Sequence, residues 1–172
     1  MSKVKNLAYI GLMAAIMCIL SPITIPLGGG VGITLGIFVI LFMTYVIGMG
    51  RALIAYGIYL LLGVVGLPVF AGFHGGIGTL MGPTGGFLVG YVAVIVSTGL
   101  TLKIKDKRLF LIIGSIVGLL ICYLLGCFWY MHVMKVDFVG ALWMCVIPFV
   151  VFDGIKVAMV CVIGPPCKKR VK

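Results

Sequence analysis

Six long apolar runs fill most of this 172-residue chain and constrain its fold more than any other feature. The runs are residues 7–27, 31–49, 52–70, 80–102, 109–131 and 139–163. A helix that crosses a bilayer needs about 20 predominantly apolar residues, and each run is close to that length. Charged residues make up only 9% of the sequence, whereas they make up about a quarter of a soluble domain. We therefore predict an all-α integral membrane protein, a single domain of six transmembrane helices over residues 1–172.

Basic residues outnumber acidic ones and lie at the edges of the apolar runs. The chain has 13 lysine and arginine residues against three aspartates, and its net charge is +10 at pH 7. Basic clusters between membrane-spanning segments mark the cytoplasmic side. With residues 3–5, 103–108 and 168–172 on that side, both termini are cytoplasmic. This placement accounts for the charge without a polynucleotide, so we expect contact with membrane lipid and no nucleic acid.

The connections on the opposite side predict a cavity. Two of them, residues 28–30 and 71–79, are rich in glycine, which permits close backbone approach. Residues 28–30 fit a linker and a functional loop equally well. Prolines at the run ends interrupt helices, and such interruptions are tolerated in a membrane where they line a cavity. We therefore expect a substrate cavity that opens to the outer side.

Residues in and near the 71–79 loop are candidates for this cavity. His74 is either a lid residue that hydrogen-bonds a ligand or a solvated loop histidine. Aromatic residues near such a loop can form apolar walls, although they also form interfacial belts. Helix threonines commonly bond their own backbone, which makes them weaker candidates. The further candidates are Phe70, Phe73, Leu80, Thr34 and Thr84.

An aspartate and a lysine in the last apolar run form the most informative motif. Asp153 and Lys156 are three residues apart, so they share one face of a helix. Each charge alone costs several kcal/mol at bilayer depth, and an ionisable pair there is a functional-site candidate. Asp153 accepts hydrogen bonds and Lys156 donates them. A cyclic urea fits both groups, and a ligand carboxylate fits Lys156; the sequence leaves both orientations open.

The familiar catalytic motifs are absent. The chain has no G-x-x-x-x-G-K-[ST] loop, no G-x-S-x-G elbow and no H-E-x-x-H helix. We therefore expect neither an ATPase nor another enzyme, and no cofactor. The six cysteines lack a C-x-x-C pair and are interpreted as small buried hydrophobes, so no metal site is expected.

Two small residues in the first run, Gly11 and Ala15, have the spacing that allows another helix to approach closely. This spacing serves either as a docking face for a membrane partner or in internal packing.

Two other functions are compatible with the charged pair. A self-sufficient secondary carrier for a small organic acid would use Lys156 as its anion site, and it would work in liposomes without ATPase partners. A structural membrane protein would use Asp153 and Lys156 only to fasten helices, and it would bind no small molecule saturably.

Two segments give the chain a family resemblance. The segment G-L-P-V-F-A-G at residues 66–72 and the segment G-P-T-G-G at residues 82–86 together resemble the signature of the BioY family. BioY proteins are the biotin-specific substrate-binding (S) components of energy-coupling factor transporters. The late Asp153 and Lys156 match the family's biotin-binding aspartate and lysine.

The resemblance implies a function for the whole chain. It implies high-affinity biotin binding and uptake by a six-helix protein of a prokaryotic cytoplasmic (inner) membrane, with biotin as the transported ligand. It further implies a transmembrane coupling protein and two cytoplasmic ATPase subunits as partners. The family's first-helix motif docks on the coupling protein, which assigns that role to Gly11 and Ala15. The ligand-contacting polar position of the family's loop would be His74.

Overall fold

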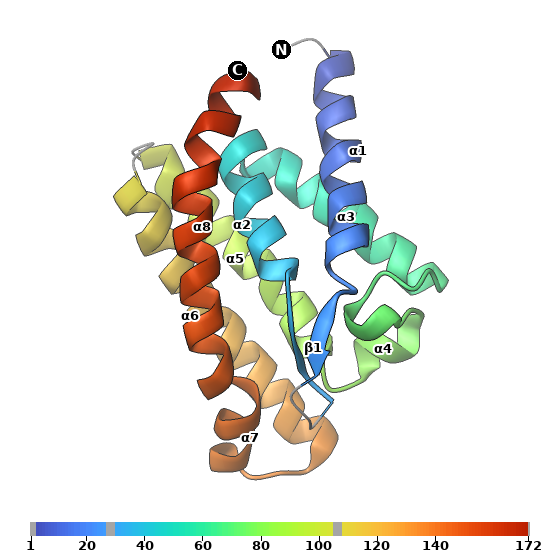
Figure 1. The fold of residues 1–172 in the computed structure, drawn as a ribbon. Coiled ribbons are helices and arrows are strands. Elements are labelled where there is room, and N and C mark those ends of the chain that lie inside the picture. Colours follow the sequence, from blue (N-terminus) through green and yellow to red (C-terminus); the bar gives the residue numbers. More distant parts are fainter. Residues whose placement is uncertain (1–2, 27–29, 105–107, 172) are drawn as a thin grey trace.

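The computed structural model describes residues 3–26, 30–104 and 108–171, most of which lie in helices. Both termini lie at one end of the molecule, and the short α7 and the strand β1 lie toward the other end (Figure 1). The elements are α1 (Lys3–Leu20), β1 (Thr24–Pro26), β2 (Gly32–Thr34), α2 (Gly36–Ile47), α3 (Met49–Val65), η1 (Ala71–Phe73), α4 (Ile77–Met81), α5 (Gly85–Ile104), α6 (Arg108–Met134), α7 (Phe138–Cys145) and α8 (Ile147–Val171).

Every one of the six apolar runs contains a helix, which confirms the prediction of a mainly helical chain. Within the described ranges, four helical segments are long and apolar enough to cross a membrane. They are Lys3–Leu20, Gly85–Ile104, Arg108–Met134 and Phe138–Arg170. The apolar helices α2 and α3 are shorter, with 12 and 17 residues.

The central helix of the fold is α2. It contacts α1, α3, α5 and α8, and ten of its residues from Gly36 to Ile47 are buried. A helix that is apolar on all sides is typically buried in this way. The helices around it expose large apolar side chains on their outer faces, including Leu61, Leu124 and Val151. Such outer faces suit contact with lipid.

Small residues bring α5 and α6 together along their length. A Cβ atom on Gly90 would lie 2.7 Å from the sulfur of Cys122. The ring of Phe87 lies against Gly126, where a Cβ atom would collide with it. Close helix approach through small residues is typical of membrane proteins, and it makes these two helices a closely packed pair.

A short antiparallel sheet precedes α2 and was not expected from the sequence. β1 pairs with β2 in the register Thr24 to Thr34, Ile25 to Ile33 and Pro26 to Gly32. The second apolar run therefore begins as a strand, and its helix begins only at Gly36. Of the 28–30 loop, residues 28 and 29 lie outside the described part of the chain.

The sixth apolar run is divided into α7 and α8 at Val146, whose backbone is not helical (φ −123°, ψ −57°). Pro148 occupies the second position of α8, where its missing N–H removes no intrahelical hydrogen bond. Proline therefore lies at the start of a helix here, next to the interruption between α7 and α8.

Candidate functional site

A buried ion pair on α8 forms one end of a central cavity. The Nζ atom of Lys156 lies 2.7 Å from Oδ1 of Asp153, and the two residues are only 5% and 1% exposed. The hydroxyl group of Tyr123 on α6 donates a hydrogen bond of 2.6 Å to the other carboxylate oxygen, Oδ2. Both oxygens of Asp153 are therefore satisfied in a site remote from water. Removing either charged partner, Asp153 or Lys156, would leave a buried charge without compensation.

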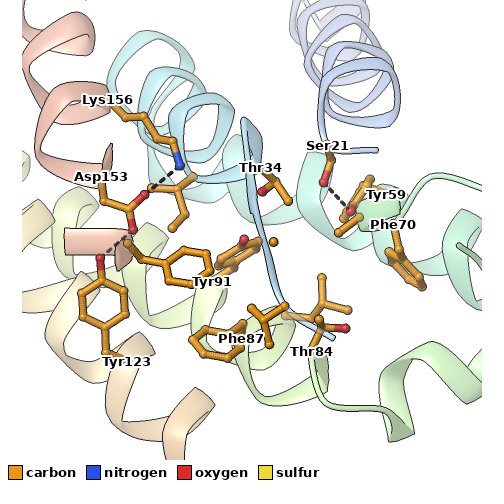
Figure 2. A pocket seen from close by; sticks show the side chains of 16 residues that line it. Ser21, Thr34, Tyr59, Phe70, Thr84, Phe87, Tyr91, Tyr123, Asp153 and Lys156 are labelled. Atoms are coloured by element: carbon orange, nitrogen blue, oxygen red, sulfur yellow. Dashed lines mark hydrogen bonds and ion pairs between the residues drawn. The ribbon is translucent and has the colours of Figure 1, made fainter. Parts of the chain in front are cut away.

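Two hydroxyl groups form a second polar point on the far side of the same cavity. Ser21 Oγ, just after α1, and Tyr59 Oη, on α3, lie 2.8 Å apart and are buried. Figure 2 shows this pair and the Asp153–Lys156 pair on opposite sides, with the rings of Tyr91 and Phe87 between them. The cavity therefore has a polar pair at each end and mostly apolar side chains between them.

The rest of the cavity wall is mostly apolar and comes from all parts of the fold. Thr34 of β2 lies in this wall, and its hydroxyl oxygen accepts a hydrogen bond of 3.2 Å from the backbone N–H of Gly36 at the start of α2. The remaining lining residues are Val31, Gly32, Ile37, Phe70, Ala71, Thr84, Phe87, Leu88, Tyr91 and Phe149.

The central cavity is narrow. Its free volume is about 40 Å³, whereas pockets for small-molecule ligands typically measure about 300–1,000 Å³. Its own side chains fill most of the space, so a vitamin-sized ligand fits only after some of the covering segments move.

The G-L-P-V-F-A-G segment covers the cavity by folding back on α3. Gly66 ends α3 with φ +114°, a conformation that favours glycine. The ring of Phe70 lies directly on the backbone of Gly63, where a Cβ atom would collide with it. Gly76 N–H also donates to the carbonyl oxygen of Gly63 at 2.7 Å. Gly63 of α3 thus permits the close approach that brings Phe70 into the cavity wall.

The same segment is tied to the sheet. The backbone N–H of Gly72 lies 3.0 Å from the carbonyl oxygen of Pro22 and 3.0 Å from Thr24 Oγ1. Because Val31, Gly32 and Ala71 line the cavity on this side, the sheet and the 66–76 loop together form its cover.

Some of the residues expected at the site line the central cavity, and the others lie outside it. The structure brings Asp153, Lys156, Thr34, Thr84 and Phe70 together in the central cavity. The remaining expected residues lie outside its lining.

His74 lines a neighbouring cavity of about 500 Å³. The residues that this cavity shares with the central one are Val31, Gly32, Ala71 and Thr84. Its Nδ1 atom lies 2.9 Å from the carbonyl oxygen of Ala71. Phe73 is 66% exposed, and neither Phe73 nor Leu80 is among the residues that line these two cavities.

Gly11 and Ala15 lie elsewhere, on the exposed face of α1. A Cβ atom on Gly11 would meet no atom of the described chain within 4 Å, so internal packing does not require a glycine there.

Four residues with hydroxyl groups were missed by the sequence reasoning. They are Ser21, Tyr59, Tyr91 and Tyr123. The three tyrosines lie inside apolar runs, and an aromatic hydroxyl there needs a hydrogen-bond partner when buried. That requirement is a sequence signal that went unused. Within the described residues, no group of three or more histidine, cysteine, aspartate or glutamate side chains comes together as a metal site.

Comparison with known proteins places these features in a family. The chain matches the BioY family over residues 1–172. It is 37% identical over 169 residues to the biotin transporter BioY of Thermotoga maritima, with 96% of each chain covered. It is 38% identical over 165 residues to the biotin transporter BioY2 of Lactococcus lactis, covering 95% of this chain and 90% of that protein.

One solved structure has the same fold. It is the crystal structure of the S-component for biotin from an ECF-type ABC transporter, with a TM-score of 0.88 and 27% sequence identity. The match covers 98% of this chain and 95% of that one.

Proposed function

Because this chain belongs to the BioY family, we propose that it binds biotin and takes it up as the substrate-specific subunit of an ATP-driven ECF-type importer. BioY relatives are transporters and not enzymes. The ATP that drives transport is then hydrolysed in separate subunits.

The buried Asp153–Lys156 pair in the wall of a cavity is the observation that carries this proposal. Biotin has a cyclic urea at one end, a thioether ring, and a carboxylate on an aliphatic chain at the other end. Among the described residues that line the central cavity, Lys156 is the only cation, so it takes the carboxylate. The apolar middle holds the thioether ring and the aliphatic chain, and the hydroxyl groups of Ser21 and Tyr59 take the urea.

Ligand capture requires the cover to move. In our proposal the sheet and the 66–76 loop first swing away, which widens the narrow cavity. They then close over the bound biotin. The neighbouring cavity, with His74 in its wall, provides the path. His74 and Phe73 contact the ligand during its passage, and Leu80 supports the loop from the start of the next run.

The charge distribution supports an orientation in the membrane. Lys3, Lys5, Lys168 and Lys169 lie close to the two termini, which share one end of the molecule (Figure 1). By the positive-inside rule that end is cytoplasmic. We propose six membrane-spanning segments, with α7 and α8 counted as one, and a cavity that opens to the outside of a prokaryotic cytoplasmic membrane.

The exposed small residues of α1 support a docking face. Gly11 and Ala15 are one helical turn apart, and the glycine has no role in internal packing. A membrane helix of a coupling protein can approach the backbone closely there. We propose that α1 docks on this coupling protein, which connects the chain to two cytoplasmic ATPase subunits.

The alternatives expected from the sequence explain less. A purely structural pair needs no cavity beside it, yet Asp153 and Lys156 line one. A self-sufficient carrier for organic acids would not require an exposed docking face on α1, and the relatives are biotin transporters.

Calorimetric titration of the purified full chain with biotin tests the function. We expect tight, saturable binding, with biotin displacing desthiobiotin and with lipoate binding far more weakly. A folded sample, judged by a sharp melting transition, that gave no heat of binding would refute the biotin assignment and leave the pair as a packing device.

A further inference from the structure

The passage between the two cavities has one side that does not belong to the cover. Among the described residues, Val31, Gly32, Ala71 and Thr84 line both cavities. The first three belong to the cover. Thr84 (Figure 2) lies instead just before α5, in residues 82–86, which we call the 82–86 segment. A ligand that moves from one cavity to the other therefore passes between the cover and Thr84.

The side chain of Trp129 on α6 contacts the 82–86 segment at three points. Its indole Nε1–H donates a hydrogen bond of 2.9 Å to the carbonyl oxygen of Gly82. A Cβ atom on Gly85 would lie 3.1 Å from the same nitrogen, and one on Gly86 would collide with the Cβ atom of Trp129. Gly85 and Gly86 therefore leave room for this tryptophan to lie directly against the segment.

Trp129 lies on the side of α6 that packs on α5. Cys122 and Gly126 make close contacts with α5, and Trp129 follows Gly126 by three residues, which places it on the same side of the helix. The contact between Trp129 and the 82–86 segment therefore continues the closely packed α5–α6 pair beyond the start of α5.

Thr84 is tied to this helix pair, whereas the link to the cover is lightly packed. The carbonyl oxygen of Thr84 accepts hydrogen bonds of 3.1 Å from the N–H of Phe87 and 3.2 Å from the N–H of Leu88. On the other side, α4 (Ile77–Met81) joins the 82–86 segment to the 66–76 loop, and none of its five residues is buried. The loop can therefore move without displacing Thr84.

We propose that the 82–86 segment is the fixed side of the passage and that Trp129 is the positioning residue that holds it, so that the cover closes against Thr84. This inference rests on the proposed function, because it assigns Trp129 a role in ligand capture. Trp129 itself lines neither cavity, so it acts on the ligand through Thr84. A tryptophan of an interfacial belt only anchors the chain at headgroup level, whereas Trp129 uses its N–H to hold a segment of the passage.

The test measures biotin release and backbone hydrogen exchange in the purified full chain. Trp129→Phe keeps an aromatic ring against the glycines and removes the N–H donor. Trp143→Phe is the matched control, because this other tryptophan of the chain is 65% exposed on α7 and lines neither cavity. Stopped-flow displacement measures the dissociation rate. Exchange mass spectrometry compares residues 82–88 with residues 66–76, with and without biotin.

We expect Trp129→Phe to raise the dissociation rate of biotin about fivefold, as for the loss of one hydrogen bond, and to change the association rate less than twofold. A residue needed only for folding would lower the fraction of chains that bind and leave the dissociation rate of that fraction unchanged. That result would overturn the proposal, and so would an equal change of rate in Trp143→Phe.

Hydrogen exchange tests which side of the passage is fixed. In the parent chain, biotin should slow exchange in residues 66–76 and leave residues 82–88 nearly unchanged. Trp129→Phe should speed exchange in residues 82–88 about fivefold, because the hydrogen bond that holds the segment is lost. Equal slowing of both segments by biotin, or unchanged exchange of residues 82–88 in the variant, would contradict the proposal.

Thr84→Ala tests whether Trp129 acts through Thr84. In this background Trp129→Phe should change the dissociation rate less than twofold, because coupled residues have non-additive effects. An undiminished fivefold effect would refute the role of Thr84. If the parent chain bound no biotin, the proposed function would fail. Exchange of residues 82–88 without biotin would then still decide whether Trp129 holds the segment.

Discussion

The hydroxyl group of Tyr123 on α6 donates to Oδ2 of Asp153 on α8, at 2.6 Å. Lys156 contacts the other oxygen of the same carboxylate. The position of Asp153 in the central cavity therefore depends on α6 as well as on its own helix, and it changes if either contact is lost.

Tyr123→Phe should lower both stability and biotin affinity while preserving the fold. A hydrogen bond to a charged group contributes about 1.5–3 kcal/mol, and its loss frees the carboxylate to reorient. The melting temperature and the calorimetric Kd measure the two effects. Tyr130→Phe is the control, because this buried tyrosine on the same helix bonds the sulfur of Met144 at 3.4 Å and lies outside the cavity lining. Equal effects of the two substitutions on the Kd would contradict the prediction.

Replacing both Asp153 and Lys156 should separate the effect of the pair on protein stability from its effect on biotin binding. Asp153→Leu or Lys156→Met alone leaves one buried charge unpaired, which should cost about 3–5 kcal/mol. The double variant removes both charges, so it should recover much of the melting temperature. It should still fail to bind biotin. A double variant that bound biotin like the parent chain would show that the pair has only a packing role.

Lys156 should recognise the carboxylate group of the ligand. The parent chain should prefer biotin to its uncharged amide, biotinamide, by roughly tenfold to a hundredfold, as expected for a hydrogen bond between charged groups. Lys156→Met should bind the two compounds about equally. If the variant kept the preference, the carboxylate would lie at the other end of the cavity, near Ser21 and Tyr59.

Weakening the tie between the sheet and the loop should speed ligand release. Thr24→Val removes the Oγ1 atom that faces the N–H of Gly72, while the carbonyl oxygen of Pro22 still accepts from that N–H. A net loss of about 1 kcal/mol should raise the dissociation rate of biotin about fivefold. Stopped-flow displacement measures it. Thr101→Val on α5, which removes a hydroxyl bonded only within its own helix, should leave the rate unchanged.

A large side chain on the exposed face of α1 should uncouple transport from binding. Gly11→Leu should keep the biotin Kd of the isolated chain, because a Cβ atom at this exposed position has no neighbour within 4 Å. Uptake by cells that express the complete importer should fall sharply. Gly57→Leu on α3 is a matched control, since a Cβ atom there also meets nothing within 4 Å. A similar loss of uptake in both variants would show that the exposed face of α1 has no special role in coupling binding to transport.

The helices were predictable because a membrane imposes a simple rule on sequence. Long apolar runs must hydrogen-bond their own backbone, so the helical content followed directly. The β1–β2 sheet did not follow, because each strand has only three residues and their composition continues that of the neighbouring apolar runs. Only their pairing, in which Thr24 lies opposite Thr34, distinguishes the two strands from the neighbouring apolar runs.

The charged part of the site was predictable and its hydroxyl part was not. Asp153 and Lys156 are conspicuous because ionised groups are rare in apolar runs. Tyr59 and Tyr123 resemble ordinary core or interfacial aromatics in sequence, and their role depends on partners 38 and 30 residues away. Long-range pairing of this kind leaves no periodic signal along the chain.

The narrowness of the central cavity also matters for the cell that carries this protein. Its free volume of about 40 Å³ has room for only about three water molecules. A space of that size does not make the central cavity a channel, so in this conformation the chain holds no preformed aqueous pathway at this site.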